Sequence, residues 1–376
     1  MARTPKKVAA KAKPAKKPAR KTRAPALTSA ASYLDQLKKL KEVDAADFGM
    51  LDDGMILPPV EEVIPTSNLA IDRLIGGGWP VGRITEVAAW EGVGKSTLID
   101  QSIAQVQRMG GIGCIIDTEC ARTPSYTASL GVKIGDLLAI RARTVEEVFA
   151  AIERVLEVQE VAAKSAKGSP PPLLLCWDSV GGTATEAELA GEAGDQHMAS
   201  AAKVIRRNLR RLSQRLAPLR TALVLSNQFY KSIGGFGGGG GNIAYGGKGI
   251  AYHASLRLWL ARTGALKLSD GTVIGQEVEA KIKKTRIGMP RPPVKTALIF
   301  GGGFDNAYAL FQWGKDSLNP DGAPWIQQKG AHCWLYPEGE APIHFQRTFY
   351  GLGQLLTEQP DTYRAMATQF TENHDG

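Results

Sequence analysis

The sequence predicts an α/β protein whose mostly parallel central β-sheet is covered by helices. Apolar, strand-like segments alternate with helical segments along most of the 376 residues, and this alternation is typical of parallel sheets with both faces covered. One strand, LLLCWD (173–178), is apolar up to its final acid. Another strand, in EVAAWEGVGKSTLID (86–100), is followed directly by a glycine loop and the start of a helix.

The N-terminal segment differs in composition from the rest of the chain. Residues 1–27 hold ten basic and no acidic side chains, while the whole chain has a formal net charge of +9. A Lys/Ala/Pro-rich segment cannot bury enough apolar surface to offset its ordering entropy, so residues 1–28 are predicted to be a disordered basic tail. Attachment to nucleic-acid phosphates is favoured over a nuclear-type address or a transit peptide, and a solubilising arm is nearly as good an explanation.

The remaining elements follow from periodicity and from turn residues. A short amphipathic helix is expected at 29–42, because Leu34, Leu37 and Leu40 fall near one face. From about Val63 the α/β pattern begins, with expected strands at 83–90, 111–117, 173–178, 221–228, 250–262, 277–286 and 294–300. Expected helices are 95–109, 144–160 and 198–216; 162–172 is a polar loop and 229–249 a glycine-rich loop.

After residue 300 the pattern changes to a small α+β region, 301–376, which ends in a helix at 360–371. No apolar run approaches the roughly 18 residues that a membrane-spanning helix needs. The sequence therefore predicts no membrane segment.

The glycine loop has the residues of a phosphate-binding loop. Gly92 and Gly94 allow backbone N–H groups to face anionic oxygens, Lys95 neutralises phosphates, and the hydroxyl of Ser96 or Thr97 ligates Mg²⁺. Ala89 stands where such loops have their first glycine. Alanine is tolerated there if φ is negative and otherwise costs about 1 kcal/mol.

Three polar residues fall at the ends of predicted strands, where open α/β sheets bind ligands. Asp178 ends LLLCWD and is suited to hold Mg²⁺ through water. Glu119 follows CIID and could polarise an attacking water, and Gln228 ends LVLSNQ and could sense the γ-phosphate. Each alone is compatible with an ordinary strand-end residue, but their combination with the phosphate loop indicates an ATPase.

Several blocks in register resemble the bacterial RecA recombinase family. They are IPTSNLAIDRLIGGGWPVGRITEV (64–87), DSVGGTATEAELAGEAGDQHMASAAKVIRRNLRRL (178–212), GGKGIAYHASLRLWLARTGAL (246–266) and VIGQEVEAKIKKTRIG (273–288). The resemblance implies a RecA-type P-loop ATPase core at 63–300, preceded by an N-terminal helix and polymerisation segment at 29–62. It also implies ATP and Mg²⁺ as cofactors.

The resemblance assigns roles to individual positions. Glu119 matches the general base, Asp178 with Ser96 the Mg²⁺ site, and Gln228 the switch from γ-phosphate to DNA. Lys284 and Arg286 match a pair that reaches the neighbouring subunit's γ-phosphate and, with Glu119, Lys95 and Gln228, complete the catalytic set. The ATP-binding residues implied are Ala89, Trp90, Glu91, Gly92, Val93, Gly94, Lys95, Ser96, Thr97 and, stacked on adenine, Tyr126.

DNA contacts are implied in two loops, about 189–198 and 229–249, and on the basic helix that follows the first loop. The residues implied are Met198, Lys203, Arg207, Arg210, Lys231, Phe236, Gly246, Gly247 and Lys248. A passive linker for the glycine-rich loop and a solvated basic face for the helix are the plain alternatives. Tyr252 matches a subunit-interface position.

The implied function is homologous pairing and strand exchange by a helical filament on single-stranded DNA. Its partners would be single-stranded DNA, homologous double-stranded DNA, further copies of the chain, and repressor or mediator proteins of an SOS-type response to DNA damage. A cytoplasmic, nucleoid-associated location follows from that role. There are two alternatives. One is a non-catalytic paralogue that binds ATP as a mediator, and the other is a ring ATPase such as a helicase. The end TENHDG lacks a long acidic tail, so easier loading onto DNA is expected.

Overall fold

The computed structural model describes residues 29–37, 39, 60–165, 169–191, 197–231, 242–268, 270–346 and 348–372. Helix α1 (Ala30–Leu37) belongs to a separate unit, residues 1–59. It confirms a helix at this place, although the described helix is shorter than the expected 29–42. The predicted disordered tail, residues 1–28, lies outside the described residues.

The main sheet is mostly parallel, as the sequence predicts. In the described part of the chain its strands run in the order β12-β11-β10-β9-β3-β7-β6-β4-β5, with β8 beside β7. Strands β9, β3, β7, β6, β4 and β5 are parallel, whereas β10, β11 and β12 extend the sheet in antiparallel fashion. The bounds are β3 Ile84–Ala89, β4 Ile112–Asp117, β5 Leu137–Arg141, β6 Leu173–Asp178, β7 Thr221–Lys231, β8 Asn242–Ala244, β9 Leu256–Lys267, β10 Val273–Thr285, β11 Val294–Ile299 and β12 Gly303–Asp305.

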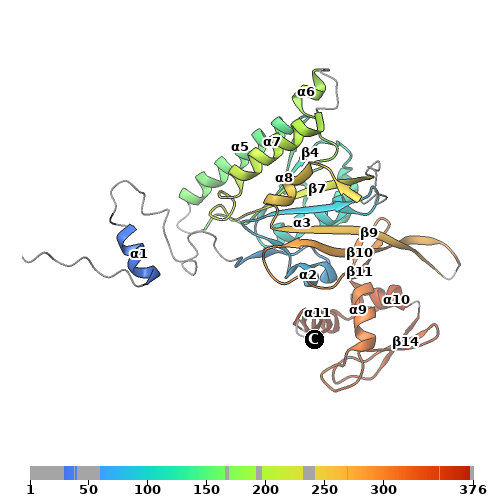
Figure 1. The fold of residues 1–376 in the computed structure, drawn as a ribbon. Helices are drawn as coiled ribbons and strands as arrows, with labels where there is room; N and C mark the ends of the chain where they lie inside the picture. Colours follow the sequence, from blue (N-terminus) through green and yellow to red (C-terminus); the bar gives the residue numbers. More distant parts are fainter. Residues whose placement is uncertain are drawn as a thin grey trace, which may run out of the picture. The chain divides into compact units, whose positions relative to one another are not determined.

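Helices cover both faces of this sheet because its strands are apolar on both. Successive strand side chains point to opposite faces, so Leu174 and Cys176 of β6 join one buried cluster, and Leu175 and Trp177 join another. Helices α2 (Leu69–Ile75) and α3 (Lys95–Arg108) pack on the first cluster. Helices α5 (Val145–Ser165), α7 (His197–Leu212) and α8 (Gly247–His253) pack on the second, and α5 runs beside α7 (Figure 1).

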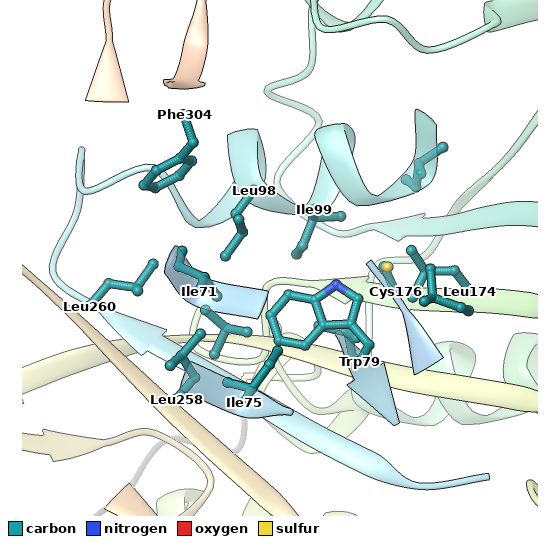
Figure 2. Close-up of a cluster of buried hydrophobic side chains, with 14 of the residues drawn as sticks. Ile71, Ile75, Trp79, Leu98, Ile99, Leu174, Cys176, Leu258, Leu260 and Phe304 are labelled. Atoms are coloured by element: carbon teal, nitrogen blue, oxygen red, sulfur yellow. The ribbon is translucent and has the colours of Figure 1, made fainter. Parts of the chain in front are cut away.

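The core under α3 centres on a buried tryptophan. Figure 2 shows Trp79 between Leu98 and Ile99 of α3 and apolar side chains of the sheet. Trp79 belongs to the short strand β2 (Trp79–Pro80), which pairs with β1 (Val63–Ile64). Its indole Nε1 donates a 2.8 Å hydrogen bond to Ser102 Oγ, which satisfies the one polar atom of the ring. This packing fixes α3, and hence the loop before it, against the sheet.

The C-terminal elements have a core of their own. A three-stranded antiparallel sheet, β13 (Ile326–Lys329), β14 (His332–Leu335) and β15 (Ile343–Gln346), packs with α9 (Asn306–Asp316), α10 (Thr348–Glu358) and α11 (Pro360–Glu372). Ala70 of α2 joins this cluster, and the elements lie together below the main sheet in Figure 1. Helix α11 confirms the predicted helix at 360–371.

Several expectations about element limits are wrong. Helix α7 ends at Leu212 instead of 216, and strand β10 begins at Val273 instead of 277. Residues 250–253, expected to begin a strand, belong to helix α8, and the strand β9 begins at Leu256. The glycine-rich loop is shorter than 229–249, because β7 continues to Lys231 and residues 242–249 form β8 and the start of α8. Helix α5 continues to Ser165. None of the described helices is long and apolar enough to cross a membrane.

Candidate nucleotide site at the strand ends

The phosphate loop joins β3 to α3 through two glycines with left-handed backbones. Gly92 has φ 73° and Gly94 has φ 95°, a region that favours glycine. A Cβ on Gly94 would also lie 2.7 Å from Leu298 Cδ2. Ala89 is the last residue of β3 and is not among the positive-φ residues of the described chain. Alanine is therefore unstrained at the position where the first glycine is missing.

Lys95 is held inside this loop. Its Nζ donates to the carbonyl oxygens of Ala89 (3.4 Å) and Trp90 (3.2 Å), and the side chain is buried. Burial lowers the pKa of Lys95, whereas the nearby charges of Asp178 and Glu119 oppose that shift. The ammonium is thus aimed at the loop and lies within the field of Glu119, the predicted general base, and of Asp178, the predicted Mg²⁺-associated acid.

The two hydroxyl residues after Lys95 differ in environment. Ser96 is exposed at the first turn of α3. Thr97 is buried, and its Oγ1 lies 3.2 Å from the hydroxyl of Tyr126 in α4 (Pro124–Ser129). Gln276, which sequence reasoning missed, donates from Nε2 to the carbonyl oxygen of Gly92 at 2.7 Å. Because Gln276 lies on β10, far along the chain, nothing near the loop motif signals it.

The predicted acids and the predicted sensor meet at one edge of the sheet. Asp178 pairs in register with Asp117 of β4, and Gln228 with Ala89 of β3, while Trp177 of β6 pairs with Leu225 of β7, so Asp178 and Gln228 lie within about two residues of the same level. Gln228 Nε2 donates to Glu119 Oε1 at 3.0 Å. Ser179 Oγ donates to the same oxygen. The structure therefore brings Lys95, Glu119, Asp178 and Gln228 together, as expected from parallel strands.

A buried arginine that the sequence analysis missed occupies this edge. Arg122 Nη2 lies 2.8 Å from Asp178 Oδ2, and its Nε donates to Asp100 Oδ1 at 2.9 Å. Burial opposes the charge of Arg122, but Asp178 and Asp100 together outweigh it and raise its pKa. Burial raises the pKa of Asp100, and Arg122 opposes that shift. An available signal was Asp100 itself, an acid within the buried face of α3.

The oxygen ligands of the site suit magnesium. Mg²⁺ prefers one or two carboxylates, waters and phosphate oxygens, and the site offers an exposed hydroxyl at Ser96 and the Asp178 carboxylate. Among the described residues, Arg122 is the only direct partner of that carboxylate. No group of three or more His, Cys, Asp and Glu side chains in the described chain could hold a metal ion. A magnesium ion here would thus need oxygens from a bound nucleotide.

The predicted interface residues form a second cluster, at the end of α8. Lys284 Nζ donates to the carbonyl oxygens of Ala251 (2.6 Å), Tyr252 (3.2 Å) and Ala254 (2.8 Å). Burial, with the nearby charge of Arg286, lowers the pKa of Lys284 to about 8. Arg286 is exposed, and the Tyr252 side chain is 55% exposed. Both are accessible to another molecule.

The predicted DNA-binding residues fall in several environments. Lys203, Arg207 and Arg210 are exposed on α7, and Gly247 and Lys248 are exposed at the start of α8. Gly246 is buried and has φ 78°. Phe236 and the side chains of Met198 and Lys231 lie outside the described residues, as do 192–196 and 232–241 of the two predicted loops.

Comparison with known proteins places these residues in a family. The family described as RecA N-terminal domain matches residues 53–305. The protein named Protein RecA from Methylococcus capsulatus is 35% identical over 279 residues, which are 73% of this chain and 74% of the relative. That of Thioalkalivibrio sulfidiphilus is 32% identical over 315 residues, 83% of this chain and 84% of the relative. The chain therefore belongs to the RecA family.

Proposed function

We propose that this chain is an ATP-dependent recombinase that forms a helical filament on single-stranded DNA. The filament would pair that strand with homologous duplex DNA and exchange strands, in DNA recombination and repair. The single observation that supports this most is the 3.0 Å hydrogen bond between Gln228 and Glu119 beside the phosphate loop. It joins the residue expected to sense the γ-phosphate to the residue expected to activate water.

The geometry supports ATP hydrolysis with assigned roles. The N–H groups of the loop and the Lys95 ammonium would bind the β- and γ-phosphates. Glu119 would take a proton from water as the water oxygen bonds to the γ-phosphorus. The bond from that phosphorus to the bridging oxygen then breaks, which leaves ADP and inorganic phosphate. Mg²⁺, held at Ser96 and through water at Asp178, would supply neutralisation of phosphate charge.

The contacts of β7 support coupling between nucleotide and DNA. Asn227 Nδ2 donates to the carbonyl oxygen of Tyr245 at 2.8 Å, and Tyr245 N donates to Gln228 O at 3.2 Å. Tyr245 follows β8, at the end of the glycine-rich segment. A γ-phosphate that drew Gln228 away from Glu119 would therefore act on a strand to which that segment is tied. Such an order change in a loop is a recurrent kind of switch.

Filament formation is proposed from the second cluster. Exposed Arg286 and Tyr252 are suited to meet a neighbouring subunit, with Lys284 beside them. A cation supplied in trans stabilises the charge of the transition state. Hydrolysis would then require contact between subunits, as a filament provides. The DNA role carries with it the proposals of a cytoplasmic, nucleoid-associated location and of repressor or mediator partners.

One observation favours the alternative, a mediator that binds ATP without catalysing strand exchange. Lys284 contacts three carbonyl groups of its own chain, and Asp178 is paired with Arg122. Both contacts would have to be compatible with catalysis in a recombinase. The test is ATP turnover with and without single-stranded DNA, followed by strand exchange between a circular single strand and a linear duplex. DNA-stimulated turnover with exchange supports the recombinase, and ATP binding without turnover supports the mediator.

A further inference from the structure

Arg122 is fixed between two carboxylates at the nucleotide site. Its guanidinium contacts Asp100 on α3 and Asp178 at the end of β6, at 2.9 and 2.8 Å. The Arg122 side chain is 15% exposed, and those of Asp100 and Asp178 are 3% and 6% exposed. A planar guanidinium with several donors can bridge two acids in this way, whereas an ammonium is a single point charge.

Asp100, which Arg122 links to Asp178, is itself fixed by a second contact. Asp100 Oδ2 accepts a 2.9 Å hydrogen bond from Thr127 Oγ1 in α4. Arg122 could leave Asp178 only if it also left Asp100 or pulled Asp100 away from Thr127. Separating a buried acid from its cation is costly because it leaves an uncompensated charge. The position of the guanidinium beside Asp178 is therefore determined by α3 and α4.

This bridge places a permanent positive charge where a divalent cation would approach Asp178. Lys95 is a second cation in the field of the same carboxylate. For a dication that binds through water, one extra unit charge a few ångströms away weakens binding by about tenfold even at the dielectric constant of water, and by more at a site as buried as this one. Nucleotide phosphates bring several negative charges and reverse that balance.

We propose that Arg122 is a positioning residue that orients and partly neutralises Asp178, so that Mg²⁺ binds there only together with nucleotide phosphates. This proposal rests on the proposed nucleotide site. It explains in addition why a metal ion without nucleotide would bind there only weakly. Arg122 touches neither substrate nor metal in this account. It acts through the Asp178 carboxylate, and the guanidinium stays in place when the nucleotide enters.

The test compares metal binding in variants that differ at the bridge. Arg122→Leu alone leaves two buried carboxylates without a cation and is expected to be strongly destabilised. The double variant Asp100→Leu/Arg122→Leu removes the pair and leaves Asp178 in place, and Arg122→Lys keeps one positive charge. Mn²⁺ binding without nucleotide is measured by electron paramagnetic resonance, and circular dichroism checks that each variant is folded.

The double variant should bind free Mn²⁺ several-fold more tightly than the wild type, because the positive charge it loses touches Asp178 whereas the negative charge of Asp100, lost with it, lies on the other side of Arg122. Arg122→Lys should stay close to the wild type. Adding Asp178→Asn to the double variant should abolish the gain. ADP affinity at saturating Mg²⁺ should change by less than about twofold, since no phosphate contact is lost. A folded double variant with wild-type Mn²⁺ affinity would overturn the inference alone. A wild-type protein that binds no ATP or ADP would overturn the proposed function.

Discussion

Glycine at position 182 leaves the space that the Glu119 side chain occupies. A Cβ added there would lie 3.0 Å from Glu119 Oε1, 3.1 Å from Glu119 Cγ and 3.2 Å from Ser179 Oγ. Gly182 is not among the residues with positive φ, so alanine suits its backbone. In Gly182→Ala the exposed carboxylate of Glu119 must therefore move by several tenths of an ångström, and its hydrogen bond to Gln228 must lengthen or break.

The expected effect is on turnover rather than on binding. A misplacement of 1 Å costs about 100-fold in rate, so a shift of part of that distance should lower kcat by about tenfold. ATP affinity should stay within about twofold, because the phosphate loop is untouched. Steady-state hydrolysis with single-stranded DNA gives kcat, and a fluorescent nucleotide gives affinity. Thermal unfolding should show a loss of no more than about 1 kcal/mol, since the displaced side chain can move toward solvent.

Two controls make this prediction strict. Gly135→Ala adds the same methyl group where nothing lies within 4 Å, and it should leave kcat unchanged. In a Glu119→Gln background, Gly182→Ala should cause no further loss, because both changes act on one group. A folded Gly182→Ala variant with wild-type kcat, or with equal losses in both backgrounds, would show that the added methyl group does not act through Glu119.

The remaining predictions concern pH and DNA. Burial, with the nearby charge of Arg286, lowers the pKa of Lys284 to about 8, so the side chain loses its proton as the pH rises through 8. DNA-stimulated ATP turnover should therefore fall in that pH range. In a pH–rate profile, Lys284→Arg should move the fall to higher pH. Replacing exposed Lys203, Arg207 and Arg210 by alanine should make the slope of log affinity against log salt concentration for single-stranded DNA shallower by about 2, at ~0.7 per phosphate contact. Fluorescence-anisotropy titrations measure this slope. An unchanged slope would indicate that the basic face of α7 is only solvated. Deleting residues 1–27 should lower the affinity for DNA and make its dependence on salt concentration shallower. A wild-type slope would assign this segment to another role.

The strands of the parallel sheet could be predicted from the sequence because buried strands appear as short, continuous apolar runs. In β6, every position from Leu173 to Trp177 is apolar and fully or almost fully buried. Helix α8 could not be predicted in the same way. Its glycines have low helix propensity, but a Cβ on Gly249 would lie 2.9 Å from Arg206 Cβ of α7. The close packing of two helices selects glycine there, and that reason is visible only in three dimensions.

The residues of the candidate site also differ in whether the sequence could predict them. Lys95, Glu119, Asp178 and Gln228 could be predicted because each lies at or shortly after the end of a recognisable apolar run. Their proximity follows from the parallel pairing of the strands. The direct hydrogen bond between Gln228 and Glu119 could not be predicted in that way. Arg122 and Gln276 were missed because their partners lie on other elements. Arg122 stands in a segment without periodicity, and its charge gains meaning only when Asp100 and Asp178 are seen beside it.

In the proposed filament each nucleotide is hydrolysed between two subunits. One subunit provides the phosphate loop and the general base, and the next provides the cation. Mixing two inactive variants tests this arrangement most directly: Glu119→Gln lacks its base but keeps Arg286, and Arg286→Ala lacks the cation but keeps its base. In an equal, random mixture about one interface in four pairs an intact loop with an intact cation. Such a mixture should regain about a quarter of wild-type DNA-stimulated turnover. A mixture no more active than its two components would contradict this arrangement.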